Sequence, residues 1–147
     1  MSGAVIRKDS PLDRIKDEAR AKKRTVVLPE GIEPRVIRAA KTIIEEKIAK
    51  VILLGDKDEI ARLAGQYELD LSQVELIDPT TSEHLHSFAE EFCEIRKAKR
   101  ISMEQAEETM RKYLFFGAMM VRRDMADASV AGSINTTGDV LRAGIQV

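Results

Sequence analysis

Short apolar runs alternate along the chain with longer stretches in which apolar residues recur every three or four positions. The short runs are rich in β-branched residues and predict buried strands, whereas the longer stretches have the spacing of helices that bury one side. Strands are predicted at 25–28, 50–54, 74–77 and 128–131. The clearest helical stripe lies in the helix predicted from Pro34 to Glu46 and contains Val36, Ile37, Ala40, Ile43 and Ile44.

Capping residues mark several of the predicted helix starts. Ser10, which precedes a proline, predicts a helix to about residue 21, and Ser102 predicts a second helix with acid and amide side chains in its first turn. Further helices are predicted at 57–67, from about 82, and at 114–121. Each helix therefore follows a predicted strand or another helix after a short connection.

Strands that alternate with helices are typical of a parallel sheet covered on both faces. We therefore predict an α/β protein with three α/β/α layers and a mainly parallel sheet. In such sheets ligands bind beyond the carboxyl ends of the strands. Three predicted loops fall at that edge, at 29–31, 55–56 and 132–137. A binding site is expected there.

Composition narrows the possible functions. Of 147 residues, 44% are hydrophobic and 33% charged, which is typical of a globular protein. The formal net charge of −1 gives no general attraction to polyanions or bilayers, so we expect no nucleic acid and no membrane as partners. The single Cys93 excludes an intramolecular disulfide and argues against zinc. The sequence has no apolar run near 18 residues and no secretory pattern, so a cytoplasmic location is expected.

The segment from Asp124 onward contains the clearest candidate site. Small residues lead through Gly132 into Thr136 and Thr137, and Thr136 has capping-box spacing to an acid, which predicts a helix start. The first amides of a helix favour an anion, and Arg142 adds a full positive charge. This pattern predicts one wall of a pocket for phosphate or another oxyanion. A capped structural helix with an Asp139–Arg142 surface pair is the alternative.

Other candidates are weaker. Residues 96–100 form the densest basic cluster, at a predicted helix end, and either lie in solvent or bind the phosphates of a nucleotide-like ligand. His84 and His86 should point to different sides of one helix, which argues against a shared metal, and both are expected in solvent. Cys93 is expected to be buried and inert. The methionines at 103, 110, 119, 120 and 125 are interpreted as core residues. The catalytic residues remain unknown.

Nearly the whole chain resembles phosphate acetyltransferases, including Arg96-Lys97 and Lys99 before the helix that starts at Ser102, and two segments carry the clearest motifs. The first is Val27-Leu-Pro-Glu-Gly31, followed by Glu33, Arg35, Val36 and Ala39-Ala40. The second and more specific runs from Asp124 to Val147. The matching residues there are Asp127, Val130, Gly132, Thr136, Thr137, Asp139, Leu141, Arg142 and Gln146. The departures from the family pattern are Ala128, Ala131, Ser133, Gly138 and Ala143.

The resemblance implies a specific reaction and fold. The family moves an acetyl group between coenzyme A and inorganic phosphate, and usually forms a homodimer. Residues 1–147 would form the N-terminal α/β lobe of a two-lobe fold like that of isocitrate and isopropylmalate dehydrogenases, with the second lobe absent. Arg142 would handle phosphate or acetyl phosphate and Arg96 would contact coenzyme A, while Thr136, Thr137 and Gly132 complete the predicted substrate-binding set. Coenzyme A is a substrate, and neither a metal nor a resident cofactor is implied.

The resemblance also implies what this chain lacks. The family's catalytic serine, aspartate and a further arginine lie in its second half, so this chain alone is expected not to transfer acetyl groups. Phosphate butyryltransferases and the phosphotransacetylase-like domain of large malic enzymes remain open. A non-catalytic module that binds phosphate or a nucleotide, or that serves subunit contacts, is the other class of function.

Overall fold

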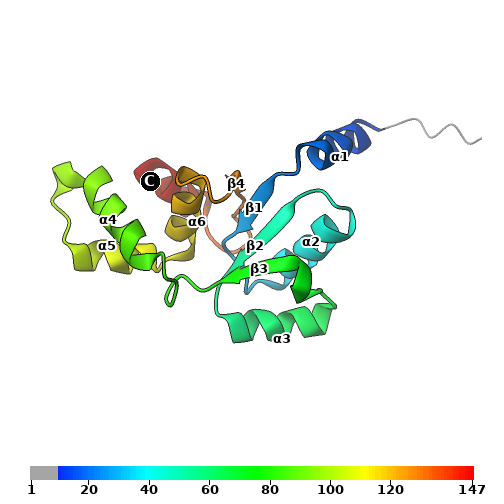
Figure 1. The fold of residues 1–147 in the computed structure, drawn as a ribbon, viewed down its shortest axis with the longest axis horizontal. Helices are drawn as coiled ribbons and strands as arrows, with labels where there is room; N and C mark the ends of the chain where they lie inside the picture. The colour runs from blue at the N-terminus through cyan, green and yellow to red at the C-terminus, as the bar shows by residue number, and fades with distance from the viewer. Residues whose placement is uncertain (1–9) are drawn as a thin grey trace, which may run out of the picture.

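A parallel sheet lies between two layers of helices in the computed structural model, which describes residues 10–147 (Figure 1). The strands are β1 (Thr25–Leu28), β2 (Lys50–Leu54), β3 (Val74–Ile77) and β4 (Ala128–Ser129), in the spatial order β3-β2-β1-β4. All three strand pairs are parallel. The prediction of a three-layer α/β fold with a parallel sheet is confirmed.

Three strands have the predicted bounds, and β4 is shorter than predicted. Only Ala128 and Ser129 pair with β1, and Val130 adds one more bond, from its N–H to the carbonyl of Val27 at 3.0 Å. The chain then leaves the sheet. From Gly132 onward the backbone N–H groups bond to a side chain instead of a strand, which ends the pairing.

The described residues form seven α-helices. They are α1 (Pro11–Lys22), α2 (Pro34–Glu45), α3 (Lys57–Tyr67), α4 (Leu85–Ile95), α5 (Met103–Met110), α6 (Tyr113–Arg122) and α7 (Thr137–Gln146). The capping side chains predicted at Ser10 and Ser102 both accept a bond from the third residue of their helix. The helix predicted from about residue 82 begins at Leu85, because residues 82–84 form a turn closed by the bond from Leu85 N–H to the Ser82 carbonyl.

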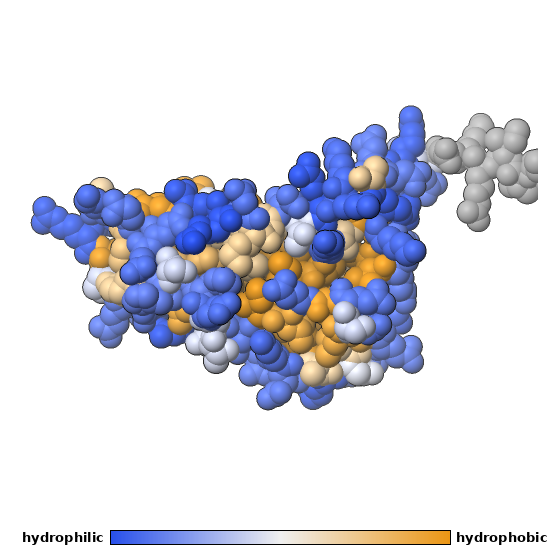
Figure 2. Space-filling view, viewed as in Figure 1, coloured by the Kyte–Doolittle hydropathy of each residue, from blue (hydrophilic) through white to orange (hydrophobic). Residues whose placement is uncertain are grey.

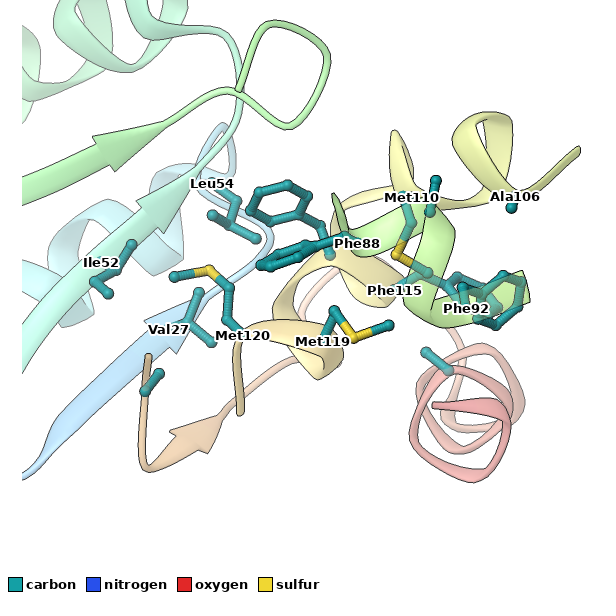
Figure 3. Packing of buried hydrophobic residues seen from close by; sticks show 14 residues of the cluster. Val27, Ile52, Leu54, Phe88, Phe92, Ala106, Met110, Phe115, Met119 and Met120 are labelled. Carbon is teal, nitrogen blue, oxygen red and sulfur yellow. The ribbon is translucent and has the colours of Figure 1, made fainter. Parts of the chain in front are cut away.

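The sheet separates two hydrophobic cores. Leu28, Val51 and Leu53 face α2 and α3, whereas Val27, Ile52 and Leu54 belong to the core built with α4, α5, α6 and α7. In this second core the rings of Phe88 and Phe116 lie 4.8 Å apart. Figure 3 shows Met120 pointing toward Val27 of β1. Met110, Met119 and Met120 are fully buried, which confirms their interpretation as core residues.

The outer surface is mostly polar. On the face shown in Figure 2, charged and polar residues predominate on α1, although Leu12 and Ile15 of that helix are exposed, and apolar residues gather around the edge of the sheet where β3 lies. The helix α1 buries no residue and is held by polar contacts, including a 2.7 Å bond from Arg20 Nε to the Glu46 carbonyl. Within residues 10–147, no helix has both the length and the apolar character needed to span a membrane.

Candidate functional site

The carboxyl ends of β1 and β4 bring together two loops that are far apart in the sequence. Residues 29–31 follow β1, and residues 132–135 follow β4, its parallel neighbour. The chain proceeds from β1 to β2 and β3 on one side, then returns to place β4 on the other. This change of direction is where ligand sites form in open parallel sheets. The predicted meeting of these loops at one edge is confirmed.

Glu30 is the residue that joins the two loops. Its Oε1 accepts bonds from the N–H groups of Gly132 (2.7 Å) and Ser133 (2.9 Å). Its Oε2 accepts bonds from the N–H groups of Ile134 (2.7 Å) and Asn135 (2.9 Å), and from Asn135 Nδ2 (3.0 Å). The residue is only 2% exposed. Successive N–H groups around one carboxylate form an anion-binding concavity, or nest.

Burial and hydrogen bonding act on the pKa of Glu30 in opposite directions. Burial is the largest single influence and would raise the pKa, but the bonds from Ile134, Ser133 and Asn135 together lower it from 4.5 to about 2. Glu30 is therefore ionised at neutral pH although it is buried. The neighbouring Gly31 is needed for space, because a Cβ there would lie 2.5 Å from the Leu54 carbonyl oxygen.

The loop amides are thus bonded to an anion supplied by the chain itself. We predicted that the small-residue run before Thr136 receives an external phosphate, but in the structure the carboxylate of Glu30 occupies these amides. Gly132 remains a predicted substrate contact, but its own N–H is already donated to Glu30. The sequence placed Glu30 in a loop at the predicted ligand edge and in the motif shared with the family, but gave it no role of its own. The available signal was an acid two residues after the end of a buried strand, at the predicted ligand edge.

The predicted start of α7 is present. Thr136 Oγ1 accepts a bond from the Asp139 N–H (3.2 Å) and donates one to Asp139 Oδ2 (2.7 Å). The hydrogen bond from the Thr136 side chain, with a smaller effect of Arg142, lowers the pKa of Asp139. Arg142 Nη1 lies 3.3 Å from Asp139 Oδ1, so the surface pair of the alternative interpretation exists. Thr137 is the exposed first residue of the helix.

Arg142 also lines a pocket of about 270 Å³. The first turn of α6 forms one side of this pocket, and Asn135 with the beginning of α7 forms the other. Its lining residues are Lys112, Tyr113, Leu114, Phe115, Asn135, Asp139 and Arg142. Arg142 therefore both pairs with Asp139 and lines the pocket. The surface pair of the alternative interpretation is confirmed, and the binding of an oxyanion by Arg142 stays a prediction.

The pocket combines positive charge with an apolar side. Among the described residues no side chain caps α6 at Lys112, so the positive end of its dipole lies at the pocket. Lys112 and Arg142 add two positive charges, Asp139 adds one negative charge, and Leu114 and Phe115 are apolar. Burial, with smaller effects of Asp78 and Asp56, raises the pKa of Tyr113, which keeps its phenol protonated at neutral pH. This combination suits an oxyanion that carries a small apolar group.

Arg96 lies elsewhere. The residue ends α4 and is followed by a 3₁₀ turn at Lys97–Lys99, which confirms that the basic cluster sits at a helix end. Arg96 is half-buried and does not line the pocket that contains Arg142. Its contact with coenzyme A stays a prediction.

The remaining candidates have structural partners. His86 is exposed and bonds to Glu107 (3.1 Å), whereas His84 stacks on Phe88 and is less exposed than predicted. The Cys93 thiol is half-buried beside the Ser102 carbonyl, so the prediction of a buried thiol holds only in part. Within residues 10–147, no group of three His, Cys, Asp or Glu side chains is placed to hold a metal ion.

Comparison with known families gives a consistent result. The family model described as phosphate acetyl/butaryl transferase matches residues 10–147. The phosphate acetyltransferase of Thermoanaerobacterium thermosaccharolyticum is 43% identical over 138 residues, which are 94% of this chain and 42% of that protein. The phosphate acetyltransferase of Treponema pallidum is 46% identical over 123 residues, or 83% of this chain and 37% of that protein.

Solved structures agree with the sequence relatives. A phosphotransacetylase from Streptococcus pyogenes superimposes with a TM-score of 0.87 at 29% identity, and covers 92% of this chain and 41% of its own. The EutD phosphotransacetylase from Staphylococcus aureus gives a TM-score of 0.83 at 38% identity, with the same coverage of 92% and 41%. The chain spans about two fifths of the length of these relatives.

Proposed function

The chain belongs to the phosphate acetyl/butaryl transferase family, and from this premise we propose that it supplies part of a site where an acetyl group passes between coenzyme A and inorganic phosphate. Acetyl-CoA and phosphate give coenzyme A and acetyl phosphate. Relatives at about 40% identity are phosphate acetyltransferases. We propose that these residues form the N-terminal lobe and one wall of the site.

The pocket between α6 and α7 is the observation that carries the proposal. Phosphate and acetyl phosphate are multiply charged near neutral pH, and Lys112, Arg142 and the positive end of α6 border one small volume, where they outnumber the single carboxylate of Asp139. A guanidinium can bind two phosphate oxygens at once. Leu114 and Phe115 offer an apolar surface on which an acetyl methyl group can rest.

In the proposed reaction this lobe positions the substrates and forms no covalent bond with them. In the direction of acetyl-CoA synthesis, the thiolate of coenzyme A attacks the acyl carbon of acetyl phosphate. A carbon–sulfur bond forms, the carbon–oxygen bond to phosphate breaks, and phosphate leaves with the electron pair. Arg142 and Lys112 hold the phosphate in place and balance its charge as it leaves. The resemblance assigns proton removal to residues outside this chain.

The share of the relatives' length that this chain spans determines which activity we expect of the chain alone. It spans about two fifths of their length, so we propose that it binds phosphate-bearing ligands without sustained turnover. We further propose that no metal or resident cofactor takes part. A homodimer of the full-length protein and a cytoplasmic location remain predictions, as does the choice of acetyl over butyryl groups.

A binding and activity experiment tests the proposal. Calorimetry of this chain with inorganic phosphate, acetyl phosphate, coenzyme A and ATP is combined with an assay for acetyl-CoA formation from acetyl phosphate and coenzyme A. We expect binding of phosphate and acetyl phosphate, and no sustained thioester formation. Tight binding of ATP alone would favour a nucleotide-binding module instead. Robust turnover would contradict the proposal that this chain binds the ligands while residues outside it are needed for acetyl transfer.

A further inference from the structure

The loop at 132–135 has little apolar packing to hold it in place. Ile134 is 56% exposed, and Val130 just before the loop is 57% exposed. The helix that follows, α7, buries only Ala143. Hydrophobic burial therefore contributes little to the position of this segment relative to the sheet. Polar contacts must determine where it lies.

Those polar contacts come from one short segment after β1. Glu30 accepts all four successive backbone N–H groups of the loop and the side-chain amide of Asn135. The loop also accepts a hydrogen bond: Arg35 Nη2 donates to the Ser133 carbonyl at 2.8 Å. The Nε of Arg35 in turn donates to Glu33 Oε1 at 2.7 Å. The loop is thus held through both its N–H groups and a carbonyl.

Asn135 connects this buried contact to the pocket. It supplies two of the five bonds to Glu30, and it is also one of the pocket-lining residues. The next residue, Thr136, caps α7, whose first two turns place Asp139 and Arg142 at the same pocket. A displacement of the loop would therefore move Asn135 and the start of α7 together.

We infer that Glu30 is a positioning residue, which fixes the loop at 132–135 and thereby sets where Asn135 and Arg142 stand at the pocket. The inference rests on the proposed function in so far as this pocket receives the anionic substrate. Glu30 itself does not line the pocket, and all five of its partners are amide groups of the loop. It acts on the ligand only through the loop.

The test compares two variants of this chain. Glu30→Gln keeps the size of the side chain but presents an amide N–H₂ where one carboxylate oxygen now accepts bonds, so two donors lose their acceptor if Oε1 is replaced and three if Oε2 is replaced. Glu59→Gln is the matched control, because Glu59 is also a hydrogen-bonded glutamate but lies on α3 and pairs with Arg62. Amide exchange of the loop, the Arg142 Nε–H resonance and calorimetry with inorganic phosphate are the three readouts.

We expect Glu30→Gln to speed exchange of the loop amides by at least about tenfold, to shift the Arg142 resonance, and to weaken phosphate binding by about tenfold, because hydrogen bonds to a charged acceptor are lost. Glu59→Gln should change none of these. Faster exchange with an unmoved Arg142 resonance and an unchanged phosphate affinity would make Glu30 merely structural and overturn the inference.

Failure of the proposed function would look different. If the unaltered chain does not bind phosphate, the proposed function fails, and the Arg142 resonance alone then decides the inference. If Glu30→Gln does not fold, Glu30→Asp takes its place, since it keeps the charge but shortens the side chain by one methylene. If both the amide exchange of the loop and the Arg142 resonance are unchanged in Glu30→Asp, the inference is overturned.

Discussion

The first turns of α3 and α7 have the same local design and different surroundings. Each begins with a capping side chain, Asp56 or Thr136, that accepts a bond from the third residue of the helix. In each, that third residue is an acid paired with an arginine three positions later, Glu59 with Arg62 and Asp139 with Arg142. The two arginine side chains are almost equally exposed, at 60% and 62%.

The difference lies in what each helix start meets. The α3 helix packs Ile60, Leu63 and Ala64 into the core, and of its first turn Lys57 borders a pocket, which it shares with β3 and the residues after it. The α7 helix buries only Ala143, and its first turns lie opposite the uncapped start of α6, with a pocket between them. One local pattern therefore serves stability in one place and candidate binding in another. The surroundings, not the pattern, decide which.

The largest expected effect concerns the fourth residue of each helix. Ile60→Ala should lower the free energy of unfolding by about 3 kcal/mol, because it removes a fully buried side chain and leaves a cavity. Val140→Ala at the equivalent position of α7 should cost about 1 kcal/mol or less, since Val140 is half-buried. Urea denaturation measures both. Equal costs would contradict the contrast between a packed helix and a lightly packed one.

Removal of the two arginines separates binding from structure. Arg142→Ala should weaken phosphate binding by roughly 10- to 100-fold, because a charge-assisted hydrogen bond contributes about 1.5–3 kcal/mol. Arg62→Ala removes an equally exposed partner of an acid at the same spacing and should leave the affinity unchanged. Calorimetry with inorganic phosphate gives the comparison. A similar loss in both variants would show that general surface charge, not the pocket, attracts phosphate.

The capping residues should behave alike. Asp56→Ala and Thr136→Ala each remove the acceptor for a first-turn N–H and should each cost about 1 kcal/mol of helix stability. The loss at Asp56 should appear as global destabilisation in urea. The loss at Thr136 should appear mainly as faster amide exchange within α7, because that helix can open with little buried surface exposed. Global destabilisation by Thr136→Ala larger than that by Asp56→Ala would reverse this ranking.

The smallest effect is the pH dependence of the two acids. Hydrogen bonding to Arg62 lowers the pKa of Glu59, and hydrogen bonding to Thr136 lowers the pKa of Asp139. An acid whose pKa is lower in the folded state than in the unfolded state stabilises the protein at pH values above the unfolded-state pKa. This stabilisation is lost as the pH falls through the folded-state pKa. Glu59→Gln and Asp139→Asn should therefore differ from the unaltered chain at about pH 7, and the difference should be smaller at about pH 3, which lies below the unfolded values. Urea midpoints at both pH values would reveal any variant for which the difference does not shrink.

Much of the fold could be predicted because its signals are local. The run Thr25–Leu28 is β-branched and bounded by a basic segment and a proline, so the predicted strand has the observed bounds. Thr136 was recognised as a cap from a residue three positions away. The short β4 was predicted too long, because its end depends on Glu30, which competes for the next N–H groups.

The candidate site was only partly predictable because its members are distant in sequence. Arg142 was identified from the resemblance and from its place after a capped helix start. Lys112 and Tyr113 were missed, since nothing near them signals that the start of α6 faces α7. Glu30 and Asn135 lie 105 residues apart, and no spacing rule connects them.

The sequence by itself determined three of the four strands, the caps at Ser10, Ser102 and Thr136, the Asp139–Arg142 pair and the family, because each depends on residues a few positions apart or on a recognisable motif. Only the tertiary structure decided that Arg142 of α7 lines a pocket together with the start of α6, and which anion occupies the loop amides. The physical reason is the strand order. Placing β4 beside β1 brings the buried carboxylate of Glu30 to amides that it could not otherwise reach.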